Sequence, residues 1–404
     1  MKITIEKFFI IVLTILSFLG STHFIINFLN VATPFYFFQI FISLSVLIFL
    51  IRKKEVKVVY ERIMLLKYFF LFFFLNLFVQ LFYHNLSIEN EIRVLGYFLS
   101  FFSNVLALSF LFDRKDTFNF FIKLCKGILY TLIFFGIINS LNILNSNIFF
   151  VTSKAIDSYN FLFFKNTASL LEHQISYGST IAILFSTLFF NKKIALKFIK
   201  ISLIIIGIFI SFSRTAWLSM IFASTISFVR LKNFALLGLS IGLIYFIIPL
   251  DFFYNILRLE NLGSGREVVW FYAIEMLKDN FLFGFGYSSY FDIKNMFLTN
   301  FELGLFEFDS TDHLHNSYLT LIFESGIIVF IVYIFAIIEQ FLNLPQKNRN
   351  IFIYILFTFL IASFFVEFRL GGLRFFNFFF VAIIGYIISI RSVRLQKVEL
   401  KKTT

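Results

Sequence analysis

A chain of 404 residues in which 59% are hydrophobic and only 14% are charged cannot fold as a soluble domain, because soluble domains carry about 25% charged residues. Its 68 phenylalanines have to face lipid or each other. The net charge of +12 is better explained by basic loops at lipid headgroups than by nucleic-acid binding, which we do not expect. The composition predicts one all-α, polytopic membrane domain over residues 1–404.

Apolar runs recur along the chain and predict about twelve transmembrane helices, since each run is near the ~20 residues that cross ~30 Å of hydrocarbon. The first run is too long for a secretory signal and no small-residue cleavage site follows it, so it is predicted to be a retained span. The predicted spans are 7–29, 33–51, 63–83, 94–112, 117–139, 170–190, 197–212, 215–229, 233–250, 316–340, 350–366 and 373–390.

Lysines and arginines are unevenly distributed between the two sets of connections. With the N-terminus inside, 25 of the 35 fall in cytoplasmic segments, which is the bias expected of an inner-membrane protein. Both termini are therefore predicted to be cytoplasmic. The single cysteine, Cys125, falls in a predicted span, so neither a disulfide nor a thiolate metal site is expected within one chain.

Arg214 follows Ser211 and Ser213 at the outer junction between two predicted spans. It is either an interfacial arginine that extends to the headgroups or an inward-facing ligand for an anion. Basic residues are scarce on the outer side, which favours the anion ligand.

Two outer connections are long, one from about Ser140 to Leu170 and one over 251–314. The second is predicted to be a large extracytoplasmic loop that contains short helices. Ser264 and Glu267 fit a capping box before an interfacial helix over Val268 to Asp279. Arg266 would then lie in the first turn, where free N–H groups and a guanidinium favour phosphate; a salt bridge to Glu260 is the alternative.

His313, His315 and Asn316 close this loop and open the next span. A histidine at the membrane rim can accept a proton from a sugar hydroxyl. His315 is the stronger candidate, His313 is a possible substrate contact with Asn316, and a structural, hydrogen-bonded histidine remains the alternative.

Arg369 and Arg374 flank the outer turn between the last two predicted spans, around Gly371 and Gly372. Either could add to an anion site or act as an interface anchor. An acidic run before the histidines could bind sugar hydroxyls or supply an alternative base, although a solvated loop face explains it more simply: Glu302, Glu307, Asp309 and Asp312. Gly284 and Gly286 are predicted to form a turn after the interfacial helix.

In chain order these motifs resemble the O-antigen ligase and O-antigen polymerase superfamily, over about residues 200–335. The resemblance is carried by Ser-x-Ser-Arg-Thr-Ala-Trp at 211–217, Ser-Gly-Arg followed by Trp at 264–270, Gly-x-Gly at 284–286 and His-Asn at 315–316. Gly326 fits the ligase pattern further along, whereas Val329 occupies the place where the last glycine is usual.

The resemblance implies an inverting, metal-independent glycosyltransferase of the GT-C type that uses no cofactor. Its donor would be an undecaprenyl-diphosphate-linked oligosaccharide at the periplasmic face, and its acceptor another glycan or a lipid A core. Position by position, Arg214 and Arg266 match the arginines that hold the diphosphate, and His315 matches the histidine at the acceptor hydroxyl. The product would be a surface polysaccharide, an O-antigen or a capsule.

A multispan transporter or flippase of a lipid-linked or anionic solute is the alternative function. It also explains about twelve spans with scattered charges. Transporters often contain inverted repeats and ionisable residues near the bilayer midplane. The unusual charges of this sequence gather at one rim instead, which favours the enzyme.

Overall fold

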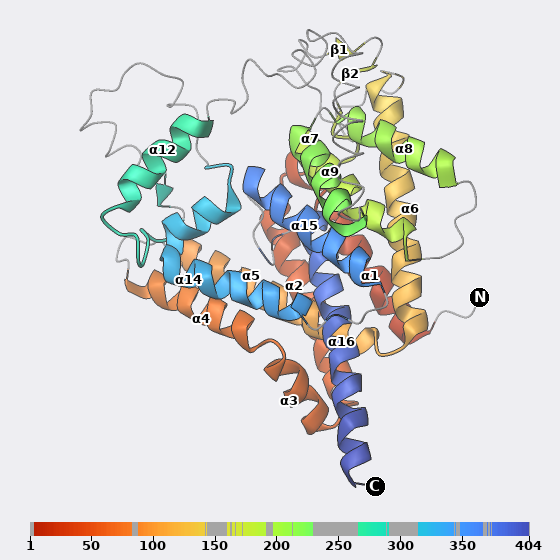
Figure 1. The fold of residues 1–404 in the computed structure, drawn as a ribbon, viewed down its shortest axis with the longest axis vertical. Helices are drawn as coiled ribbons and strands as arrows, with labels where there is room; N and C mark the ends of the chain where they lie inside the picture. The colour runs from red at the N-terminus through yellow and green to blue at the C-terminus, as the bar shows by residue number, and fades with distance from the viewer. Residues whose placement is uncertain are drawn as a thin grey trace.

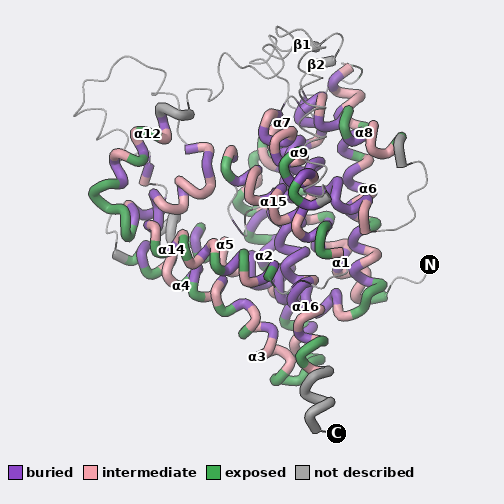
Figure 2. The backbone as a smooth tube through the Cα atoms, viewed as in Figure 1, coloured by how far each residue is buried: buried purple, intermediate pink, exposed green. Residues whose placement is uncertain are grey.

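The computed structural model describes residues 4–82, 88–141, 143, 160–161, 164–165, 167–171, 173–190, 197–211, 213–228, 266–287, 289–290, 314–342, 344, 348–366, 370, 372 and 374–403. These residues form a bundle of helices around α16, and the C-terminal turns of α16 project from the bundle (Figure 1). Figure 2 shows that buried residues concentrate where the helices face one another.

The first part of the chain forms helices joined by short turns. Their bounds are α1 Ile5–Leu19, a π-helix η1 Phe24–Phe28, α2 Ala32–Ile51, α3 Val56–Met64, α4 Lys67–Phe82, α5 Ile88–Leu111 and α6 Lys115–Ser140.

The second part begins with a hairpin of two short antiparallel strands, β1 Asn160–Phe161 and β2 Phe164–Lys165. The helices that follow are α7 Gln174–Leu184, a 3-10 helix η2 Phe185–Leu188, α8 Lys197–Phe209, α9 Arg214–Phe228, α12 Arg266–Leu277, α14 Ser317–Leu342, α15 Arg349–Phe365 and α16 Phe375–Thr403. Apart from the hairpin, the predicted all-α class is confirmed for the described residues.

Five helices among the described residues are long and apolar enough to span a membrane by themselves: Ala32–Ile51, Ile92–Leu111, Lys115–Ser140, Ser317–Leu342 and Phe375–Gln396. A sixth span results if α3 and α4, which are bent by 66°, count as one. The helices Ile199–Phe209 and α15 are apolar but shorter. The predicted span 233–250 lies outside the described residues, so the number of about twelve stays a prediction.

The first predicted span, 7–29, is not one continuous helix. The hydroxyls of Ser21 and Thr22 donate to the carbonyls of Ser17 and Leu19, at 2.9 and 2.6 Å, at the end of α1. Such bonds offer the backbone an alternative to the helix ladder. Thr22 then forms a bridge with Leu171, so a second segment of the chain meets the end of α1.

The core is built largely from phenylalanine on α16 and its neighbours. Phe380 of α16 stacks on Phe359 of α15, with the ring centroids 3.8 Å apart. Other large apolar side chains remain exposed on the outside of the helices, including Phe41, Phe74 and Leu342. Exposed apolar surface of this extent fits contact with lipid.

Charged pairs concentrate at the end of the bundle where α2 and α5 end. Arg62 of α3 is only 2% exposed and bonds to Asp113, which also pairs with Lys54 at 3.0 Å. Arg391 of α16 pairs with Glu339 of α14 at 2.9 Å. This end of the bundle will be called the charged end, and it carries the connections that the sequence predicts to be cytoplasmic.

Candidate functional site

The opposite end of the bundle is held together by hydrogen bonds between chain segments that are distant in sequence. Phe375 N donates to Ser21 Oγ at 2.5 Å, and Ser317 Oγ donates to the carbonyl of Val366 at 2.6 Å. Thr167 N donates to the carbonyl of Ile210 at 3.1 Å. We call this the site end, because the described candidate residues lie in the segments that these bonds connect or next to them.

Arg214 is the first residue of α9 and is partly buried. Two serines form hydrogen bonds at the start of this helix. Ser211 Oγ accepts from Ser213 N at 3.2 Å, and Ser213 Oγ accepts from Ala216 N at 3.3 Å. The second bond is an N-cap, which satisfies one of the free N–H groups of the first turn. The sequence Ser-x-Ser-Arg thus fixes where the helix begins and where Arg214 stands.

Gly178 of α7 packs against this helix start. A β-carbon at position 178 would lie 2.7 Å from Ser211 Oγ and 2.8 Å from the β-carbon of Ala216. Both distances are below ordinary van der Waals contact, so only glycine allows α7 and the first turn of α9 to come this close. The position of Arg214 therefore depends on a residue of another helix.

Arg266 is the first residue of α12, as its place in the predicted interfacial helix requires; the predicted cap Ser264 lies outside the described residues. One turn further along, Trp270 Nε1 donates to the carbonyl of Leu314 at 2.8 Å. The indole ring also contacts Phe364 of α15 edge-on, with centroids 5.4 Å apart. Trp270 thus fixes the helix that begins at Arg266 to the residue preceding His315.

His315 and Asn316 have different structural roles. His315 is partly exposed and has a φ of 50°, the left-handed region that histidine enters more readily than most side chains. Asn316 is 5% exposed, and its Oδ1 accepts from Tyr318 N at 3.0 Å and from Leu319 N at 3.1 Å. Asn316 is therefore the N-cap of α14, and its predicted contact with the substrate stays a prediction. His313 lies outside the described residues.

Arg374 is partly exposed and directly precedes α16, where its carbonyl accepts from Asn377 N at 2.9 Å and from Phe378 N at 3.2 Å. The segment before it runs back to the end of α15, which meets Ser317 of α14. Arg369 and the acidic run Glu302, Glu307, Asp309 and Asp312 lie outside the described residues. Side-chain bonds to backbone carbonyls thus join α12 and the end of α15 to the segment that starts α14, and Arg214 and Arg374 lie at the same end of the bundle.

Helix α14 is broken at Gly326, which has a φ of 80° and a ψ of 170°. The backbone groups freed by the break are paired by residues 281–286: Phe285 N and Gly286 N donate to the carbonyls of Phe323 and Glu324, at 2.7 and 2.9 Å. Ile327 N donates back to the carbonyl of Phe281 at 3.0 Å. The predicted turn at Gly284 and Gly286 is confirmed, and its backbone pairs with the backbone of α14 at the break.

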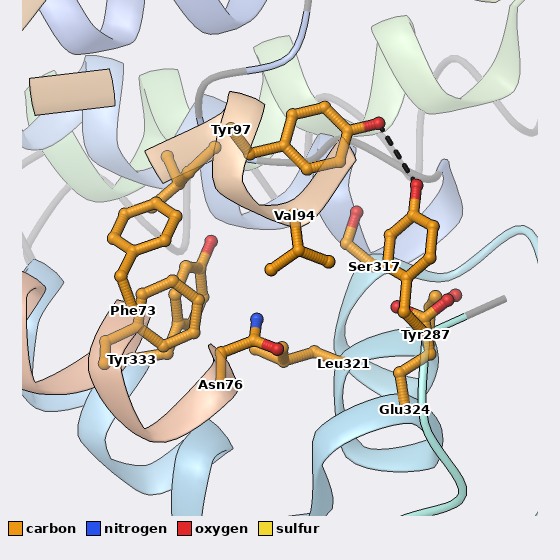
Figure 3. A pocket seen from close by; sticks show the side chains of 12 residues that line it. Phe73, Asn76, Val94, Tyr97, Tyr287, Ser317, Leu321, Glu324 and Tyr333 are labelled. Carbon is orange, nitrogen blue, oxygen red and sulfur yellow. Dashed lines mark hydrogen bonds between the residues drawn. The ribbon is translucent and has the colours of Figure 1, made fainter. Parts of the chain in front are cut away.

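A cavity of about 60 Å³ lies beside the first turns of α14. Figure 3 shows Ser317, Glu324 and Tyr287 on one side of it and Phe73 with Tyr333 on the other. The hydroxyls of Tyr97 and Tyr287 lie 3.3 Å apart across its rim. Its full lining is Phe72, Phe73, Asn76, Val94, Tyr97, Tyr287, Ser317, Thr320, Leu321, Glu324, Tyr333 and Leu370.

The motifs in the sequence did not predict this cavity. Glu324 is a carboxylate inside an apolar span, and such a residue is a candidate functional residue by itself. Gly326 follows it at a place where a continuous helix would not need glycine. These two signals could have drawn attention to the segment, but Asn76 and Tyr97 reach the cavity only through tertiary packing.

Comparison with known proteins gives one family. Residues 199–334, about a third of the chain, match the family described as O-antigen ligase. No curated protein matches the chain. The matched segment contains Arg214, Arg266, Trp270, His315 and the break at Gly326, and the family indicates a role in surface polysaccharide assembly. The similarity to O-antigen ligases is thus shown for residues 199–334.

Proposed function

We propose that this protein is a membrane glycosyltransferase that transfers a glycan from undecaprenyl diphosphate to an acceptor hydroxyl at the outer face of the inner membrane. The acceptor is either another lipid-linked repeat unit, for a polymerase, or the sugar of a lipid A core, for a ligase. The supporting observation is the bond from Trp270 to Leu314, because it joins the helix of Arg266 to the segment of His315.

The chemistry assigns one task to each residue. Arg214 and Arg266 bind the diphosphate and stabilise the charge that develops on it as the bond to the anomeric carbon breaks. His315 accepts the proton of the acceptor hydroxyl, whose oxygen attacks the anomeric carbon from the opposite face and inverts its configuration. Undecaprenyl diphosphate leaves. Arg374, and Arg369 in the same predicted turn, would add positive charge near the diphosphate.

This function requires the site end to face the periplasm and both termini to face the cytoplasm. The excess of lysine and arginine in the connections of the charged end supports that orientation. About twelve spans and an extracytoplasmic loop over 251–314 complete the proposed topology. Alkaline phosphatase fused after residue 290 should be active, whereas a fusion after residue 345 should be inactive; the reverse pattern would contradict the orientation.

The proposed function is tested by deleting the gene and examining the surface glycan on a gel. A lost polymerase leaves single repeat units on an otherwise normal anchor. A lost ligase leaves long chains on undecaprenyl diphosphate. Complementation with the wild-type gene should restore the pattern, and an unchanged glycan in the deletion strain would contradict the proposal.

A transporter of a lipid-linked or anionic solute is the second candidate, and the broken α14 favours it. Discontinuous helices commonly form substrate sites in transporters. The gel separates the two candidates further, because loss of a transporter for the lipid-linked repeat unit would remove every surface form of the glycan. In that case repeat units would accumulate on the cytoplasmic side.

A further inference from the structure

The cavity beside α14 lies at the site end of the bundle. Asn76 comes from the last turns of α4, Val94 and Tyr97 from the start of α5, and Ser317 from the first turn of α14. Ser317 is separated from His315 by a single residue. Along α14, the lining residues Ser317, Thr320 or Leu321, and Glu324 recur at the spacing of one helix face. A polar stripe therefore runs from Ser317 toward the break at Gly326.

Two buried polar side chains lie on this stripe, and the hydroxyl of one of them points to a ligand. Thr320 is 7% exposed, and its hydroxyl has no hydrogen-bond partner within the described part of the chain. Glu324 is 6% exposed and supplies a carboxylate to the cavity wall. Of the buried hydroxyls without a partner in the described part of the chain, that of Thr320 is the one in this cavity wall, and leaving it unpaired costs the free energy of its lost hydration.

The break in α14 determines the position of Glu324. Its carbonyl accepts from Gly286 N, and the next residue, Ser325, donates from Oγ to Asn76 Oδ1 at 3.0 Å. Asn76 Oδ1 also accepts from Gln80 at 3.1 Å, which orients the amide so that its nitrogen is directed into the cavity (Figure 3). The backbone at Glu324 and the side chains of Ser325 and Asn76 are thus held by bonds among α14, α4 and residues 281–286.

Charge and size restrict the ligand. No lysine, arginine or histidine occurs among the described residues of the wall, so these residues offer no cation to a diphosphate. The volume of about 60 Å³ holds roughly four water-sized groups, at the ~15 Å³ that each needs. This space suits the hydroxyl groups along one edge of a sugar ring and excludes a whole glycan. The aromatic rings of Phe73, Tyr97 and Tyr287 complete an apolar wall with few polar groups, as ligand sites have.

We propose that the cavity between α4, α5 and α14 binds the hydroxyl edge of the neutral acceptor sugar, with Glu324 and Thr320 as its hydrogen-bonding partners. The inference rests on the proposed glycosyltransferase function and names the subsite of its acceptor. Glu324 accepts hydrogen bonds from two sugar hydroxyls, and Thr320 pairs its hydroxyl with a third. The sugar held in this way presents another hydroxyl to His315.

Binding is tested with the variant Thr320→Cys and a small methanethiosulfonate reagent. The native Cys125 is buried and gives no background. The repeat-unit oligosaccharide, released from its lipid carrier by mild acid, should slow the labelling of Cys at 320 several-fold, and inorganic pyrophosphate should not. The variant Lys278→Cys, on an exposed turn after α12, should be labelled at one rate with or without saccharide.

Three outcomes would overturn the proposal: no labelling at position 320, protection by pyrophosphate alone, or equal rates with and without saccharide. This assay measures binding and not transfer, so its result is separate from that of the gene deletion. A normal deletion phenotype contradicts the transferase, whereas unprotected labelling in an active transferase contradicts only the subsite.

Kinetics provide a second measurement. Thr320→Val removes a hydroxyl without a partner in the described protein, so a purely structural threonine predicts unchanged kinetics. The subsite predicts a rise in the acceptor KM of about fivefold, the effect of one neutral hydrogen bond, with the donor KM unchanged. Thr14→Val, which removes a hydroxyl bonded to Ile10 within α1, should leave the acceptor KM unchanged. A fall in kcat alone would overturn the assignment.

Discussion

At the residue scale, the His-Asn motif places a residue with a strained backbone directly before the N-cap of a helix. His315 occupies a left-handed backbone conformation, and Asn316 pairs two N–H groups of the first turn of α14. The cap fixes the direction in which the chain enters the helix. The chemical role proposed for His315 therefore depends on a neighbour whose own role is structural.

Asn316→Ala should destabilise the protein by about 1 kcal/mol, because it leaves two N–H groups at the start of α14 without a partner. Asn316→Asp keeps an accepting oxygen and should retain nearly full stability. Thermal unfolding of the detergent-solubilised variants is the measurement. Equal melting temperatures for the alanine variant and the wild type would contradict the assignment of Asn316 as a cap.

Arg214→Ala and Arg266→Ala should each lower glycan transfer by about 10²–10³-fold, since each loses a charge-assisted contact worth roughly 2–4 kcal/mol in the transition state. The amount of each variant in the membrane should equal that of the wild type. Arg374→Ala, if it adds only long-range charge, should have a smaller effect. Near-normal transfer in both Arg214 and Arg266 variants would contradict the diphosphate assignment.

Single residues were predictable from the sequence where local chemistry determines them. Arg266 lies in the first turn of a helix, as the capping box at Ser264 predicted, and Arg214 begins a helix at the predicted junction between two spans. The cap at Asn316 was not predicted, although its residue type suits a cap. The cavity could not be predicted, because its wall combines residues as far apart as Asn76 and Glu324, and spacing in the sequence says nothing about such contacts.

At the scale of elements, the contact between α7 and α9 places a glycine against the start of the Arg214 helix. Helices approach this closely only where small residues meet. The two serines of the Ser-x-Ser-Arg motif precede this first turn. A change in α7 should therefore alter the position of a side chain in α9.

Gly178→Ala should destabilise the protein by about 1–3 kcal/mol through overpacking, and it should lower transfer because it displaces the first turn of α9. Gly127→Ala is the matched control: a β-carbon there meets nothing within 4 Å. It replaces a helical glycine of α6 and should stabilise by up to about 1 kcal/mol. Thermal unfolding and transfer assays on both variants test this contrast. Equal melting temperatures and equal transfer rates for Gly178→Ala and Gly127→Ala would contradict it.

Helix starts were predicted more accurately than interruptions within helices. The predicted spans beginning at 316 and 350 correspond to helices that begin at Ser317 and Arg349. The sequence predicts one continuous helix over 316–340, whereas the structure breaks it at Gly326. Apolar periodicity cannot reveal such a break, because the residues that satisfy its backbone come from the segment 281–286.

At the scale of the whole molecule, the charged end contains a buried cation that depends on one carboxylate. Arg62 bonds to Asp113 and Ser109, and its guanidinium lies 4.3 Å from the centre of the Phe110 ring. Asp113 also accepts from Ser389 of α16 at 3.2 Å. These contacts join α3, α5 and α16 at the end opposite the candidate site.

Asp113→Asn should destabilise the protein by about 3–5 kcal/mol, because it leaves the buried guanidinium of Arg62 uncompensated. Glu275→Gln breaks the exposed pair between Glu275 and Lys278 and should cost about 0.5 kcal/mol or less. Melting temperatures of the two variants are the measurement. A loss in Asp113→Asn no larger than in Glu275→Gln would show that the buried pair is not needed.

The helical class was predictable from composition, because a chain this apolar must satisfy its backbone within helices when it lies in lipid. The number of spans was harder to predict. The helix α7 passes into a 3-10 helix at Phe185, and α1 ends at Leu19, so several apolar runs do not form one long helix. Local hydroxyl bonds and tertiary contacts decide these lengths, and hydropathy does not record them.

The break at Gly326 has a consequence for biosynthesis. Inserted alone, α14 would expose unpaired amide and carbonyl groups to hydrocarbon, which costs several kcal/mol for each group. Residues 281–286, which pair with them, precede α14 in the chain and therefore leave the ribosome first. During translation, residues 281–286 are therefore available to pair with the break before α14 reaches the translocon. If the gene were split between α12 and α14, these residues would no longer be made ahead of α14 on the same chain.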